Sequence, residues 1–139
     1  MLLTIHLIAL GIWIGVVGAE FVIEFAGMKD NESLKSASLM HYKTDIWIEI
    51  PAFSIVLLTG FLMLNESHLE GLFFYKIIFA ILAVFFNSIN VYAVFKRRAF
   101  AIKDDLDGVQ SVTRIMRLSG LVIPCFIIAF TLGMISAAH

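Results

Sequence analysis

Long apolar stretches alternate with short polar connections along this chain. Each stretch is close to the roughly 20 residues that a helix needs to cross a bilayer core. The connections carry helix-breaking runs such as Asp104-Asp105-Leu106-Asp107-Gly108, and Asp30-Asn31-Glu32-Ser33 is a helix-start cluster. The pattern predicts four transmembrane helices, over about residues 1–27, 38–64, 72–98 and 112–138. Because short connections place sequence neighbours antiparallel, we expect an all-α integral membrane four-helix bundle, antiparallel and built as one domain over residues 1–139.

The composition is typical of a protein whose solvent is the lipid bilayer. Hydrophobic residues make up 60% of the chain and charged residues only 15%, far from the composition of soluble domains. The net charge of -1 indicates no nucleic-acid partner. The first stretch has neither a basic leader nor a small-residue cleavage site, so we expect a retained helix. The single cysteine, Cys125, excludes an internal disulfide.

Basic residues gather at one end of the predicted bundle. All but one of the ten Lys and Arg fall near the same helix ends. Because positive charge marks the cytoplasmic side, we predict a multi-pass protein of the cytoplasmic (inner) membrane, with the N-terminus and the C-terminus both outside. The residues are Lys29, Lys35, Lys43, Lys96, Arg97, Arg98, Lys103, Arg114 and Arg117.

Acidic residues stand inside two of the apolar stretches. An ionisable side chain at membrane depth is expensive and indicates a functional site. Glu20 and Glu24 share one helix face, as do His41, Asp45 and Glu49, because residues four apart are neighbours on a helix. Counting depth at about 1.5 Å per residue places the histidine opposite Glu24 and Asp45 opposite Glu20.

The other two helices bring further polar groups to this depth. Asn87 and Asn90 of the third helix fall level with the acids, and Arg117 of the fourth falls near the histidine. Pro51 has no N–H, so it leaves the carbonyl of Trp47 without its helical partner. We therefore expect one polar cluster in the cytoplasmic half, built by all four helices.

Three interpretations of this cluster are open. It is a buried ion-pair network with Arg117 and Arg114, a proton relay of protonated acids, or a metal site. The acids outnumber the well-placed arginines, and the surplus must be protonated or must hold a cation. Imidazole with carboxylates suits zinc, iron, manganese, nickel or Cu(II), and bundle cores build such sites. We predict a divalent transition metal, zinc or copper, in a protein for metal handling or transport. Its ligands would come from Glu20, Glu24, His41, Asp45 and Glu49.

The number of subunits and the question of catalysis are considered separately from the ligands. A bundle of four helices leaves little room for an enclosed pathway, so we expect a homodimer. Whether the protein is an enzyme is left open by the residues.

A second candidate site lies at the opposite end of the bundle. His6 and Lys76 begin two helices that run in the same direction, at matching depth, and the two side chains could flank one ligand. The alternative is that His6 is simply hydrogen-bonded or solvated near the membrane interface. His68 and His139 are expected to be exposed and receive no role.

The residues around His6 resemble two known membrane families. His6, Trp13 and Gly15 in HLIALGIWIG resemble the first-helix signature H-x6-W-x-G of the copper-resistance CopD-like domain and of the HemJ-type protoporphyrinogen oxidase. Lys76 is similar to the lysine that begins their third helix. The resemblance implies a four-helix membrane fold with either copper handling or, as the alternative function, a haem-binding redox role with haem b at His6 and Lys76. The chain departs from the HemJ pattern after the tryptophan, where GVVGAEFVIEF carries two acids.

Overall fold

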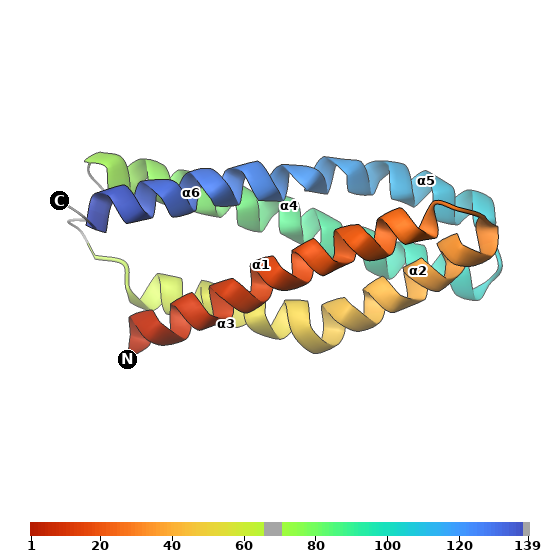
Figure 1. The fold of residues 1–139 in the computed structure, drawn as a ribbon, viewed down its shortest axis with the longest axis horizontal. Coiled ribbons are helices and arrows are strands. Elements are labelled where there is room, and N and C mark those ends of the chain that lie inside the picture. The colour runs from red at the N-terminus through yellow and green to blue at the C-terminus, as the bar shows by residue number, and fades with distance from the viewer. Residues whose placement is uncertain (66–70, 138–139) are drawn as a thin grey trace.

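Helices account for all the regular structure of this chain in the parts that can be described. The computed structural model describes residues 1–65 and 71–137. Within them four helical spans form a bundle (Figure 1), and each is long and apolar enough to cross a membrane. The expected all-α four-helix bundle is thus confirmed. The elements are α1 (Leu2–Gly27), α2 (Asn31–Thr44), a π turn (Asp45–Glu49), α3 (Ile50–Leu62), α4 (Gly71–Ile102), α5 (Leu106–Met116), a 3-10 turn (Arg117–Leu121) and α6 (Val122–Ala137).

The spans pair as two antiparallel hairpins. α1 packs on α2 and α3, while α4 packs on α5 and α6, and α2 joins the hairpins through α4. Both chain ends lie at one end of the bundle, and the α1–α2 and α4–α5 connections lie at the other (Figure 1). The connection expected between α3 and α4 includes residues 66–70, and His68 with it lies outside the described residues, as does His139.

The polar run that begins at Asp30 resembles a loop in the sequence, but in the structure it starts a helix. The second span begins at Asn31, not at residue 38, because the Asp30 side chain caps it by accepting the backbone N–H of Ser33 at 2.7 Å. This hydrogen bond also holds the pKa of the exposed Asp30 carboxyl below its usual range. The capped turn makes the connection to α1 only a few residues long.

The last two spans are also longer than expected, and the start of α5 has the same cause, a capping aspartate. Asp105 accepts the backbone N–H of Gly108 at 2.9 Å, so α5 begins at Leu106 and not at residue 112. α4 continues to Ile102, beyond the expected end at residue 98. The extra turn carries α4 past Lys96, Arg97 and Arg98, and of these three only Arg97 is buried.

Small apolar residues fill the bundle on the side nearer the chain termini. Large apolar side chains such as Phe25 and Trp47, which are 77% and 78% exposed, instead face outward, where a membrane would supply lipid. Cys125 packs within the buried cluster, in agreement with an apolar role. The cluster consists of Ala9, Trp13, Val16, Val17, Ala52, Val56, Ala83, Val122 and Cys125.

The glycines of α1 differ in what surrounds them. A Cβ added to Gly27 would lie 2.5 Å from the Cβ of Ala37, so this glycine permits the close approach of α1 and α2. A Cβ on Gly11, Gly15 or Gly18 would meet nothing within 4 Å among the described residues. These three glycines therefore do not serve helix packing within the described residues.

Gly27→Ala should destabilise the fold, whereas Gly15→Ala should not. The methyl of Ala37 is fixed to its backbone and cannot rotate away, and overpacking of this kind costs about 1–3 kcal/mol. An alanine at position 15 meets open space and improves helix propensity. Thermal unfolding of both variants in detergent measures the difference. Equal melting temperatures would show that the two helices separate without cost.

Candidate metal centre

Buried polar side chains gather between the apolar cluster and the turns at the far end of the bundle. They come from α1, α2, the π turn and α4, so both hairpins contribute. The sequence predicted this clustering of all the acids with the histidine and both asparagines. The most buried members are Glu20, Ser38, His41, Asp45, Glu49, Asn87, Asn90 and Arg97.

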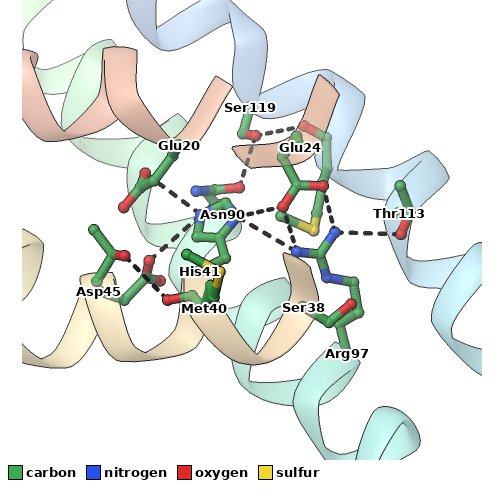
Figure 2. A network of polar contacts seen from close by, with 12 residues as sticks. Glu20, Glu24, Ser38, Met40, His41, Asp45, Asn90, Arg97, Thr113 and Ser119 are labelled. Atoms are coloured by element: carbon green, nitrogen blue, oxygen red, sulfur yellow. Dashed lines mark hydrogen bonds and ion pairs between the residues drawn. The ribbon is translucent and has the colours of Figure 1, made fainter. Parts of the chain in front are cut away.

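His41 stands at the centre of this group (Figure 2). Its Nδ1 lies 2.6 Å from an oxygen of Glu24. Its Nε2 faces the other way and lies 3.4 Å from Glu20 Oε2 and 3.4 Å from Asp45 Oδ1. Ligand atoms of Glu20, His41 and Asp45 all lie within 4.8 Å of one another, and all three residues are buried. These residues form a group that could hold a metal ion.

Glu24 lies on the opposite side of the imidazole ring and is paired with Arg97 of α4. Arg97 Nη1 donates to Glu24 Oε2 at 2.6 Å, and Nη2 donates to Oε1. Arg97 is completely buried, and its Nη1 also lies 3.4 Å from Thr113 Oγ1. The fork of two hydrogen bonds is the strong geometry of an arginine and a carboxylate. Glu24 is therefore engaged away from the three-residue group.

Glu49 lies next to that group, toward the apolar cluster. It is fully buried, and the indole Nε1 of Trp13 donates to its Oε1 at 3.4 Å. The Asn87 side chain and the Glu20 carboxylate also interact with it. Trp13 is thus a buried neighbour of the site and does not anchor the chain at a membrane interface. Glu49 is thus a neighbour of the group of three and not a member of it.

The π turn brings Asp45 and Glu49 to the same interior face as His41. These three residues are spaced by four, and in a regular α-helix each such step would rotate the side chain about 40° past a full turn. The turn is widened instead, and the N–H of Ile50 bonds to the carbonyl of Asp45, five residues back. Pro51 favours this break because it cannot donate to the helix. Single π turns are frequent at functional sites.

Several polar atoms at this site have no hydrogen-bond partner among the described residues. Buried polar groups are nearly always satisfied, so a local concentration of exceptions needs an explanation. Four of these atoms belong to the group of three: Glu20 Oε1, His41 Nε2, and Asp45 Oδ1 and Oδ2. A bound cation or protons on the carboxylates would satisfy them. The other three are Glu49 Oε2, Asn87 Nδ2 and Arg97 Nε, and the two nitrogens are donors that a cation would not satisfy.

The arginine of the cluster is Arg97 and not Arg117. Arg114 and Arg117 are both exposed, while Met116 supplies the buried position of that turn. The sequence expectation placed Arg117 in the cluster, whereas its side chain is exposed. In the sequence Arg97 stands between Lys96 and Arg98 and resembles part of an interfacial basic run, so its buried position is not apparent there.

The second candidate site has simpler contacts. His6 Nδ1 lies 2.8 Å from Thr59 Oγ1 of α3. Lys76 Nζ lies 4.1 Å from the centre of the Phe73 ring. The His6 contact agrees with the hydrogen-bonded alternative for this residue. Haem association at His6 and Lys76 stays a prediction, and a Soret band in the purified protein would be its signature.

Comparisons of this chain with protein-family models, with curated proteins and with solved structures find no match. The resemblance to CopD-like and HemJ-type proteins is therefore neither supported nor contradicted by a relative. A function has to be argued from the geometry of the buried cluster.

Proposed function

We propose that this protein binds a divalent transition metal ion inside the membrane, between α1 and the α2–α3 span. The ligands are His41 Nε2 and the carboxylates of Glu20 and Asp45. The observation that carries the proposal is the convergence of these three buried groups, with atoms that have no hydrogen-bond partner among the described residues. The 3.4 Å separations of His41 Nε2 from Glu20 Oε2 and Asp45 Oδ1 are within ion-pair range, so the competing function is an ion-pair network.

The ligand set points to the class of ion. One imidazole nitrogen and two carboxylate oxygens suit Zn²⁺ or Cu²⁺, whereas Cu⁺ prefers sulfur ligands. Three protein ligands leave a coordination position open, as in sites that exchange what they bind. Glu49 is a buried neighbour of the group but is not one of the three residues whose ligand atoms converge. Metal handling or transport is the role that such a site serves best.

Charge balance agrees with a divalent ion. The Glu24 carboxylate is compensated by Arg97 through two hydrogen bonds. The carboxylates of Glu20 and Asp45 carry two negative charges when they act as ligands, which a divalent cation cancels. Glu49 is then the one surplus acid, and it is neutral when it holds a proton. Every buried charge is thereby paired, as a low-dielectric interior requires.

Metal content measured after equilibrium dialysis against zinc tests the proposal. Wild-type protein should hold one zinc per chain, and His41→Gln and Asp45→Asn should hold none. Glu32→Gln removes an exposed carboxylate from the first turn of α2 and is the matched control. Absence of zinc from the wild type, or its retention by Asp45→Asn, would leave an ion-pair or proton network as the function of the cluster.

We propose further that the metal centre lies in the cytoplasmic half of the cytoplasmic (inner) membrane, with both termini outside. The support is the basic residues in or near the α1–α2 and α4–α5 connections, such as Lys29, Lys35 and Lys103. These connections lie opposite the termini (Figure 1), and positive charge marks the cytoplasmic side.

Cysteine labelling of intact cells tests this orientation. In a Cys125→Ala background, a membrane-impermeant thiol reagent should label Asn65→Cys, which lies at the terminal end. It should not label Met28→Cys, which follows α1 at the other end. The reverse pattern would place the metal centre in the outer half.

A further inference from the structure

We infer that Glu24 and Arg97 are positioning residues for His41. They hold its ring with Nδ1–H directed at Glu24, so that the lone pair of Nε2 is directed at Glu20 and Asp45. This inference rests on the proposed metal-binding function, because in that function the lone pair of Nε2 binds the metal ion. It assigns to Glu24 and Arg97 a role that the ligands themselves do not fill.

The pairing of Glu24 fixes which nitrogen of His41 carries the proton. Glu24 Oε1 lies 2.6 Å from His41 Nδ1, a distance at which one of the two atoms must donate. A carboxylate that already accepts two hydrogen bonds from an arginine is ionised and can only accept. The donor is therefore Nδ1–H. Nε2 of the neutral ring is then the acceptor, and it has no hydrogen-bond partner among the described residues.

Arg97 gives this arrangement its rigidity. Its guanidinium is completely buried, donates to both oxygens of Glu24 and lies 3.4 Å from Thr113 Oγ1. Its 3.4 Å approach to His41 Nδ1 is a contact between two N–H groups in this tautomer and adds no hydrogen bond. Thr113 is held in turn by a hydrogen bond of its hydroxyl to the carbonyl of Val109 at 2.8 Å. α4 and α5 thus orient a carboxylate of α1, which orients the histidine of α2. Outer carboxylates of this kind set the tautomer of metal-binding histidines, and their loss weakens metal affinity about 10- to 100-fold.

The tautomer of His41 can be read directly by nitrogen NMR of protein labelled with ¹⁵N-histidine. The signal of His41 is assigned by its loss in His41→Gln, and the pH is raised until that ring is neutral. Metal-free wild type should show the Nδ1–H form. A wild-type ring that carries its proton on Nε2 would overturn the inference.

The variant that tests the pair is the double replacement Glu24→Gln with Arg97→Gln. It leaves no unpaired charge in the interior, and an amide can either donate or accept, so it no longer enforces one tautomer. We expect a mixture of the two forms and zinc affinity lower by about 10- to 100-fold. Lys35→Gln with Asp104→Asn neutralises an exposed ion pair and is the matched control, expected to match wild type in both measurements.

The two readouts separate this inference from the metal-binding proposal. Wild type and the double variant with the same tautomer and the same zinc affinity would overturn the positioning role and leave metal binding intact. An Nδ1–H wild type that gives a mixed tautomer in the double variant, but no zinc binding in either, would support the positioning role and remove the metal proposal. Arg97→Lys keeps the charge but not the fork, and an intermediate affinity would support the geometric role.

Discussion

Zinc at a hundredfold excess over its dissociation constant should stabilise the wild-type protein by about 2.7 kcal/mol. The ion binds the folded state, in which Glu20, His41 and Asp45 converge, and the unfolded chain separates these ligands. His41→Ala and Glu20→Gln should lose the whole gain. The measurement is the melting temperature in detergent with and without zinc, manganese, nickel and copper, for the wild type and both variants.

A control and the pH dependence make this result specific. His6→Ala removes a histidine from the other end of the bundle and should respond to zinc as wild type does. The stabilisation by zinc should weaken as the pH falls, because a ligand histidine must be neutral and ligand carboxylates ionised, so protons compete with the ion. A wild-type melting temperature that no metal raises would contradict the metal centre.

Arg97→Gln should destabilise the protein by about 3–5 kcal/mol, the cost of leaving a buried charge without its partner. Arg97 is fully buried and makes both of the arginine hydrogen bonds to Glu24. Adding Glu24→Gln should restore most of the loss, because it removes the orphaned charge. Unfolding by titration with a denaturing detergent compares the three proteins.

Arg117→Gln is the matched control for this series. Arg117 is exposed, and surface substitutions usually change stability by less than about 0.5 kcal/mol. Equal losses for Arg97→Gln and Arg117→Gln would show that the buried ion pair does not govern the stability of the bundle. A double variant no better than Arg97→Gln would show that Glu24 is not the charge that Arg97 compensates.

The fold follows from the apolar pattern, but the ends of the helices do not. Four stretches of bilayer length leave few arrangements for a short chain. Asp30 and Asp105 were read as parts of connections, although each caps a helix that starts several residues before the apolar stretch. Apolar content locates what lies in lipid, whereas capping hydrogen bonds decide where a helix begins.

The members of the polar cluster were predictable, but their division of roles was not. Spacing by four residues predicts that Glu20 and Glu24 share one helix face and that His41 and Asp45 share another. The matching depth of the two helices then predicts that the four residues lie together. The separation of Glu24 from the other acids depends on Arg97, whose direction is set by the helix face that α4 presents. Sequence spacing shows which residues share a helix face, but it does not show toward which neighbouring helix that face is turned.

The π turn is a second feature that spacing alone could not supply. Pro51 indicated a break in the helix, and the structure places a wide turn just before it, from Asp45 to Glu49. The size of such a turn depends on which backbone groups find partners in three dimensions. The turn includes both Asp45 and Glu49, and both are buried on the interior face.

X-ray absorption at the zinc edge of zinc-loaded protein tests most directly whether these residues hold a metal. Wild type should show one imidazole and carboxylate oxygens at about 2.0–2.2 Å from the ion, and Glu24→Gln with Arg97→Gln, at saturating zinc, should keep the same ligands. A spectrum without imidazole, or one that His41→Ala leaves unchanged, would contradict a metal centre at His41, Glu20 and Asp45.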